Sequence, residues 1–220
     1  MPAPFTLHVD RTVRRLVKEG FIGKLLAVQL HANSGAFLDL AGELTWRRDV
    51  ALSGGNIMSM GIWYEILMRW IGEASQVMAL GNVVVPQRRD PATGQMRAVQ
   101  VPEHLDILAT MRDGAQAHLQ FSTLHGLVPA NDVTLFGSEG TLRYVDKLLL
   151  GGRRDERALQ PIQVPPDEAG AWRVEEEFIN AIRGKETVKL TDFASGVRYM
   201  AFTEAVNASL REGRMVAVPS

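Results

Sequence analysis

The sequence predicts a single α+β domain over residues 1–220, built from mostly antiparallel strands and without a Rossmann domain. Helical and strand patterns come in separate blocks, short turn signals join neighbouring strand patterns, and none of the 20 glycines is spaced as Gly-x-Gly. Separate blocks favour an α+β fold over an alternating βαβ one, and a dinucleotide fold needs the Gly-x-Gly turn. The polar segment 151–170 is too short and too near the C-terminus to divide the chain into two cores.

The first part of the chain carries two helical patterns around one strand. Apolar residues at helical spacing predict a helix over Val9–Glu19, and a strand is expected over Leu25–Leu30. A longer and mostly apolar helix is expected from about Asn56 to Ile71, after the pair Gly54-Gly55. This helix is the best candidate for a buried element that presents functional side chains.

Strand patterns fill the middle of the chain. Apolar and polar residues alternate over His104–Met111 and Ala115–Thr123, and Asp113-Gly114 between them predicts a β-hairpin with one buried face. The remaining predicted elements are strands over Val77–Val85, Arg97–Val101, Asp132–Gly137, Thr141–Val145, Leu148–Leu150 and Met215–Val218, and helices over Trp172–Arg183 and Asp192–Arg211.

Charge and composition exclude several classes of partner. The 24 basic and 25 acidic residues leave a net charge of −1, so no overall field attracts nucleic acid or an anionic membrane. The chain has no cysteine, which rules out disulfides and thiolate chemistry and fits a reducing compartment. The N-terminus lacks a signal peptide's apolar core, and charged residues break the longest apolar stretch, Ile57–Ile71. We therefore expect a soluble, cytoplasmic protein with no nucleic-acid or membrane partner.

The histidines offer little metal chemistry. Only His104 and Asp106 share one strand face, and an exposed strand pair is favoured over the start of a metal site, so no metal is expected. His125 ends its strand, where binding residues commonly lie, and it is therefore a candidate pocket residue.

Trp46, Arg47 and Arg48 form the clearest candidate binding motif. An arginine fork suits carboxylates, phosphates or sugar hydroxyls, and tryptophan offers an apolar platform for a sugar ring. The alternative is a surface loop in which Arg47 or Arg48 pairs with Asp49. Both interpretations stay open at the level of sequence.

Ser59 and Trp63 lie four residues apart on the predicted helix and therefore face the same direction. Aromatic residues on a buried helix usually pack in a core or interface, and the alternative is that this pair lines a ligand pocket. Neither side chain can serve as a general base near neutral pH, because a lone serine hydroxyl is too weak and an indole N–H only donates.

The same helix carries a family resemblance. The run SGGNIMSMGIW at 53–63, followed by RWIGE at 69–73, resembles the Gfo/Idh/MocA family of NAD(P)-dependent sugar and polyol oxidoreductases. Five segments are similar to that family's C-terminal domain and follow its order: RTVRRLVKEGFIGKLLAVQLH, TWRRDVALSGG, DGAQAHLQFST, LFGSEGTLRY and EFINAIRGKETVKLTDFASGVRYMAFTEAVNASLREGRMVAVP. The resemblance implies a large, open, mostly antiparallel sheet with helices packed on one face and a homo-oligomer formed through the other.

Two departures from the family pattern concern its chemistry. Ser59 stands where the family has an aspartate and Trp63 where it has a histidine, so no catalytic residue is assigned. The family's nucleotide-binding domain, with its Gly-x-Gly-x-x-Gly loop and Glu-Lys-Pro lysine, has no counterpart in these 220 residues. We therefore expect no cofactor in this chain, and the resemblance places NAD(P) on that other domain.

Three hypotheses for function follow. The first is the substrate-binding and oligomerisation domain of a sugar or polyol oxidoreductase, inactive alone. Its candidate contacts to a sugar-like ligand are Trp46, Arg47, Arg48, Ser59, Trp63 and His125. The second is a degenerate ligand-binding or regulatory module that acts on an intact family member. The third, an unrelated enzyme using His104 or His125 with the arginines, is disfavoured because no nucleophile, metal cluster or carboxylate pair converges in the sequence.

Overall fold

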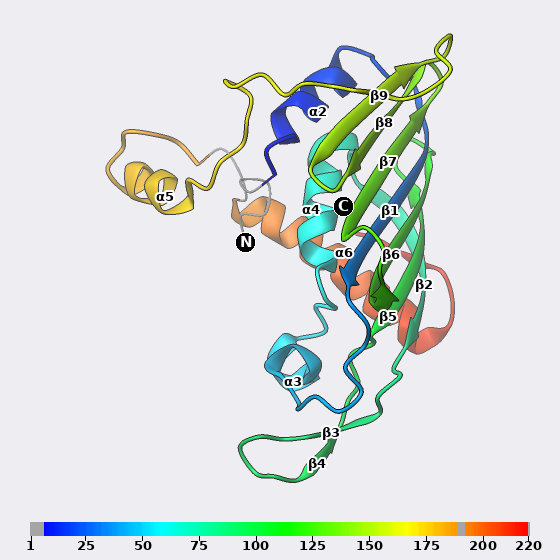
Figure 1. Ribbon diagram of the computed structural model, residues 1–220. Coiled ribbons are helices and arrows are strands. Elements are labelled where there is room, and N and C mark those ends of the chain that lie inside the picture. The colour runs from blue at the N-terminus through cyan, green and yellow to red at the C-terminus, as the bar shows by residue number, and fades with distance from the viewer. Residues whose placement is uncertain (1–6, 189–191, 220) are drawn as a thin grey trace.

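A broad, twisted sheet with helices gathered against one of its faces dominates the molecule (Figure 1). The structure, a computed structural model, describes residues 7–188 and 192–219. In chain order the elements are α2 (Asp10–Lys18), β1 (Leu25–Gly35), the 3-10 helix η1 (Trp46–Arg48), α3 (Val50–Ser53), α4 (Met60–Ile71), β2 (Ala74–Asn82), β3 (Gln87–Arg89), β4 (Met96–Ala98), β5 (His104–Met111), β6 (Gln116–Gly126), β7 (Asn131–Gly137), β8 (Gly140–Val145), β9 (Leu148–Arg153), β10 (Gln160–Pro161), α5 (Val174–Ile182), α6 (Phe193–Glu212) and β11 (Val216–Ala217).

Within the described residues the main sheet has nine strands, in the order β10-β9-β8-β7-β1-β6-β5-β2-β11. Only β1 and β6 pair in parallel among these neighbours, and the other pairs are antiparallel. The hairpin predicted around Asp113-Gly114 joins β5 to β6. Because the sheet is mostly antiparallel and the helices are segregated to one face, the predicted fold class is confirmed.

The hydrophobic core lies between the sheet and the helices α2, α4 and α6. Strand alternation sends buried side chains such as Val28, Ile107 and Leu119 to this face. The rings of Tyr64 on α4 and Phe202 on α6 stack with centroids 3.5 Å apart and join the two helices. One cluster of buried residues extends from Leu7 to Val218, so distant parts of the chain share a single core.

The described helices leave the other face of the sheet uncovered (Figure 1). We call this surface the open face. In the strand registers its central residues are polar, including Gln29, His31, His118 and Asp106. Leu80 and Leu108 lie towards one edge of it and are largely exposed.

The helix expected from about Asn56 begins later, at Met60, and the prediction of its start was wrong. Gly54 and Gly55 adopt left-handed backbone angles, with φ of 63° and 73°, and Met58 also has a positive φ of 48°. These residues cannot continue a right-handed helix. Ser59 is therefore the N-cap residue of α4 and not part of its first turn.

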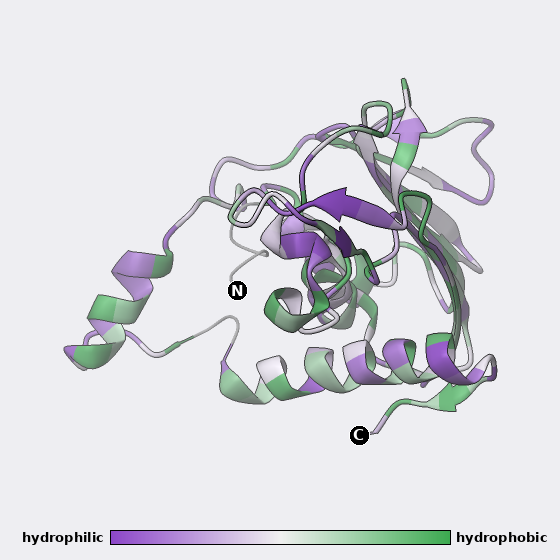
Figure 2. Cartoon of the chain, turned by 90° about the horizontal axis from the view of Figure 1, so that it is seen from below, coloured by the Kyte–Doolittle hydropathy of each residue, from purple (hydrophilic) through white to green (hydrophobic). Residues whose placement is uncertain are grey.

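Helix α5 projects from the rest of the molecule (Figure 2). Phe178 and Ile182 on this helix are largely exposed. None of the helices in the described residues is both long enough and apolar enough to cross a lipid bilayer.

Candidate binding site

The candidate site is built around η1 and α3, which follow the loop after β1. Asp49 caps α3, because its Oδ1 accepts a hydrogen bond of 3.0 Å from the Ala51 amide. Its Oδ2 pairs with Arg97 on β4 at 2.9 Å. The structure thus pairs Asp49 with Arg97 instead of with Arg47 or Arg48, in contrast to the alternative considered for this motif.

Arg47 stacks on Trp46, with its guanidinium carbon 4.3 Å from the ring centroid. This cation–π geometry places the two side chains beside a pair of pockets that share Arg47 and Met58. Arg47 and Met58 line both pockets, whereas Trp46 lines only the smaller one and Arg48 only the larger one. The three residues of the predicted motif therefore contribute to one site.

The smaller pocket has a volume of about 110 Å³. Its polar lining comes from four elements or their connections: Arg47 on η1, Ser53 on α3, Asn56 before α4, Glu65 on α4 and Tyr199 on α6. The Oγ of Ser53 is buried and has no hydrogen-bond partner in the described structure. An orphaned buried hydroxyl is unfavourable by itself, so a ligand hydroxyl would satisfy it here.

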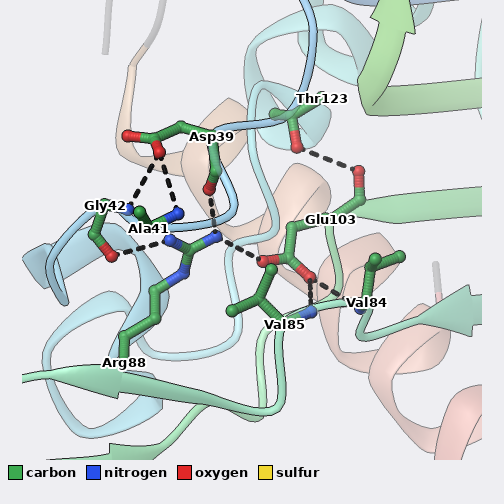
Figure 3. A network of polar contacts seen from close by, with 8 residues as sticks. All are labelled: Asp39, Ala41, Gly42, Val84, Val85, Arg88, Glu103 and Thr123. Atoms are coloured by element: carbon green, nitrogen blue, oxygen red, sulfur yellow. Dashed lines mark hydrogen bonds and ion pairs between the residues drawn. The ribbon is translucent and has the colours of Figure 1, made fainter.

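The larger pocket has a volume of about 420 Å³ and lies between the 39–48 loop, Met58 and the segment Val101–Glu103. One of its lining residues, Glu103, forms a buried ion pair with Arg88 (Figure 3). Arg88 Nη2 donates to Glu103 Oε1 at 3.2 Å, and its Nη1 donates to the Gly42 carbonyl at 2.7 Å. Arg88 Nη2 also donates to the Asp39 carbonyl at 3.0 Å, so this side chain fixes the loop that carries the binding motif.

Ser59 and Trp63 do not border the pockets described above. Trp63 is buried, and its ring lies 6.3 Å from the ring of Tyr144 on β8. Ser59 contributes its backbone carbonyl, which accepts a hydrogen bond of 3.1 Å from the Trp63 amide. The structure separates this pair from Trp46, Arg47 and Arg48.

His125 lies away from the motif as well. Its Nδ1 is 3.2 Å from Asn33 Oδ1, and its ring centroid is 5.2 Å from that of His104 on the open face. It is not among the residues that line either pocket of the candidate site.

His104 and Asp106 interact on the open face, with Nε2 and Oδ2 2.9 Å apart. The other carboxylate oxygen, Oδ1, contacts His118 Nε2 at 3.0 Å and accepts a hydrogen bond of 2.9 Å from Gln120. Across residues 7–188 and 192–219, no group of three or more histidines and carboxylates has the arrangement of a metal site.

The described residues do not form a Rossmann-type dinucleotide site. The Gly137–Gly140 turn joins β7 to β8, so it presents no helix N-terminus to a pyrophosphate. The sheet lacks the succession of parallel strands at whose carboxyl ends dinucleotides bind, because β1 and β6 are its only parallel neighbours among the described strands.

Several pocket residues were not singled out by the sequence. Glu65 had a detectable signal, because it is a carboxylate inside an apolar helical stretch and is buried in the structure. Ser53, Asn56 and Tyr199 gave no such signal. They reach the pocket because the Gly54-Gly55 turn and α6 meet there, where Asn207 Nδ2 donates to the Gly55 carbonyl at 3.0 Å.

The fold and the pockets define an open-sheet α+β domain with a candidate binding site beside the N-terminal end of a buried helix. The chain belongs to the GFO/IDH/MocA C-terminal domain family, whose profile matches residues 11–143, more than half of the chain. No curated protein matches the sequence.

Solved structures of oxidoreductases share the fold. Levoglucosan dehydrogenase in complex with NADH and L-sorbose has a TM-score of 0.82 and 19% identity, over 99% of this chain and 64% of that chain. An NAD binding oxidoreductase from Klebsiella pneumoniae has a TM-score of 0.81 and 17% identity, over 95% and 63%. A super-repressor mutant of Gal80p from Saccharomyces cerevisiae has a TM-score of 0.76 and 13% identity, over 98% and 63%. The present chain therefore spans less than two thirds of each of these structures.

Proposed function

We propose that this chain is the substrate-binding and oligomerisation domain of a NAD(P)-dependent sugar or polyol oxidoreductase. The observation that carries this proposal is the Trp46–Arg47 stack beside two pockets that share Arg47 and Met58. An aromatic face with adjacent hydrogen-bond donors suits a sugar ring and its hydroxyls. Membership of the family and the fold shared with a dehydrogenase solved with NADH and L-sorbose also support it.

The chain alone is proposed to be catalytically inactive. Ser59 and Trp63 lack the acid–base capacity required for proton transfer from a substrate hydroxyl. The described sheet also lacks the parallel strands of a Rossmann-type dinucleotide site, so we expect turnover only together with a nucleotide-binding domain. The open face is proposed to pair with a second copy of the chain.

Binding and turnover can be tested separately. We expect protein-observed NMR with a panel of sugars and polyols to shift signals of Trp46 and its neighbours, whereas NAD(H) and NADP(H) alone cause no comparable shift. No NAD(P)-dependent turnover of the same panel is expected. Turnover by the chain alone would contradict the proposal that the domain is catalytically inactive. NMR signals of Trp46 that stay unchanged across the panel would contradict a sugar site.

A regulatory module is the alternative function. Gal80p, solved as a super-repressor mutant, shares the fold of this chain at a TM-score of 0.76. This observation favours a role in which the domain acts by binding another protein and needs no acid or base at Ser59 and Trp63. Stable co-purification with an intact family member, without any sugar-induced shift at Trp46, would favour this alternative.

A further inference from the structure

Arg47 and Arg48 have no acidic partner among the described residues. Asp49, the adjacent carboxylate, is engaged by Arg97 and by the Ala51 amide. Arg47 instead stacks on Trp46, and the guanidinium of Arg48 makes no hydrogen bond or ion pair within the described part of the chain. Arginine side chains in a pocket usually have carboxylate or phosphate partners, so this arrangement calls for an acceptor.

The carboxylates that line the larger pocket are engaged elsewhere or exposed. Glu103 Oε1 accepts from Arg88, and its Oε2 accepts from the Val84 amide at 2.8 Å. Asp39 Oδ1 accepts from the amides of Ala41 and Gly42 at 3.0 and 2.9 Å (Figure 3). Glu43 is exposed at the edge of the pocket. These carboxylates therefore do not neutralise Arg48 by direct contact.

The surroundings of Arg48 favour an anion. Burial lowers the pKa of its guanidinium, and the nearby positive charge of Arg88 lowers it further. Glu103 and Asp39 oppose this effect at longer range, yet the net direction remains downward. A cation that is partly desolvated and close to another cation gains more from an anionic ligand than a fully hydrated one does.

The two pockets offer different kinds of side chain to a ligand. The smaller pocket offers Ser53, Asn56 and Tyr199, which are groups suited to sugar hydroxyls. The larger pocket offers Arg48 beside the apolar side chains of Met58, Val101 and Pro102. Arg47 and Met58 line both pockets, so the two groups of residues are neighbours.

We propose that this site binds an anionic carbohydrate, with hydroxyls in the smaller pocket and one carboxylate or phosphate group at Arg48 in the larger pocket. The inference rests on the proposed sugar-binding function and narrows its ligand class.

The test compares matched ligands by NMR titration at low ionic strength. Glucose is the neutral reference, glucuronate carries a carboxylate, and glucose 6-phosphate carries a phosphate. At least one of the two acidic sugars is expected to bind about tenfold or more tightly than glucose, which corresponds to one charge-assisted hydrogen bond. This preference should weaken as salt is added, because screening reduces the interaction of the ligand with Arg48.

Arg48→Gln should abolish the preference for the acidic sugar, and Arg48→Lys should retain part of it because the positive charge remains. Arg153→Gln removes the same charge from an arginine outside both pockets and serves as the control. The control variant should keep the full preference.

The outcomes separate the two proposals. If glucose binds as tightly as both acidic sugars, or if Arg48→Gln keeps the preference, the anionic ligand class is wrong while sugar binding stands. If neither the neutral nor the acidic sugars bind, the proposed sugar-binding function fails and this inference fails with it. Equal binding of inorganic phosphate and glucose 6-phosphate would reduce the site to a simple anion site and overturn the carbohydrate assignment.

Discussion

Arg88 and Glu103 form an ion pair whose side chains are 0% and 3% exposed. Removing one partner from a buried pair leaves an uncompensated charge, so Glu103→Ala should lower the free energy of unfolding by about 3–5 kcal/mol. The matched control is Glu176→Ala, which breaks the exposed pair between Glu176 and Arg173 and should leave stability almost unchanged. Urea denaturation measures both values.

The Nε of Arg88 is buried without a hydrogen-bond partner in the described structure, which leads to a second prediction about the same ion pair. Because that buried donor is already without a partner in the described structure, the double variant Arg88→Met/Glu103→Leu should be less destabilised than Glu103→Ala alone. A Glu103→Ala variant as stable as Glu176→Ala would show that Arg88 and Glu103 do not hold the 39–42 loop.

His31 on the open face makes stability depend on pH. Burial lowers its pKa below the ordinary value of 6.5, and the positive forms of His118 and His125 lower it further, whereas Asp132 and Asp106 oppose the shift. The folded state therefore binds fewer protons than the unfolded state as the pH falls below about 6.5. The free energy of unfolding should decrease from pH 7 to pH 5.5, which chemical denaturation at each pH measures.

His31→Gln should reduce this decrease, since the substituted side chain does not titrate. His8→Gln is the control, because His8 lies near Tyr144 and outside the open face. An identical pH dependence in the wild type and in His31→Gln would exclude His31 as a source of the effect.

At the scale of elements, Asp10 joins α2 to α4. The carboxylate pairs with Arg69, and its Oδ1 also accepts a hydrogen bond of 3.0 Å from Trp70 Nε1. Asp10→Ala should destabilise the chain by about 2–4 kcal/mol, because it leaves a buried indole donor and a mostly buried guanidinium without their acceptor. Asp10→Asn keeps an acceptor for Trp70 and should cost clearly less. Thermal unfolding of both variants tests this order, and equal losses would contradict the proposed role of the Trp70 hydrogen bond.

The elements that the sequence predicts well are those defined by local patterns. Alternation and Asp113-Gly114 predict the β5–β6 hairpin, and apolar spacing predicts α2 and α6 closely. The start of α4 was missed because Met58 adopts a positive φ that its residue type does not signal. The parallel pairing of β1 with β6 was also invisible, since the partners are far apart in the chain and the surrounding fold determines their pairing.

The same distinction applies to the candidate site. The sequence could single out Trp46, Arg47 and Arg48 as candidates because adjacent residues of suitable chemistry form a local motif. The pairing of Asp49 with Arg97 was not, because it depends on how the β3–β4 hairpin folds back onto α3. That long-range contact decides whether the two arginines are available to a ligand.

At the scale of the whole molecule, two exposed apolar surfaces lie far apart. Phe178 and Ile182 on α5 are 63% and 71% exposed, and Leu108 and Leu80 on the open face are 58% and 75% exposed. Apolar side chains gathered on one surface commonly mark an interaction site. The proposed homo-oligomer assigns the second surface to self-association and leaves the first for a different partner.

Leu108→Lys tests that assignment. Leu108 lies directly opposite Met78 in the β2–β5 register, and Leu80 extends the same apolar strip along β2. A lysine in the strip would bring like charges together across a two-fold interface and desolvate them, so the dissociation constant of the oligomer should rise tenfold or more. Phe178→Lys places the same charge at a similarly exposed site on α5 and should leave self-association unchanged. Sedimentation equilibrium over a concentration series measures both variants. A monomeric wild type, or dissociation caused by Phe178→Lys and not by Leu108→Lys, would remove the open face as the site of self-association.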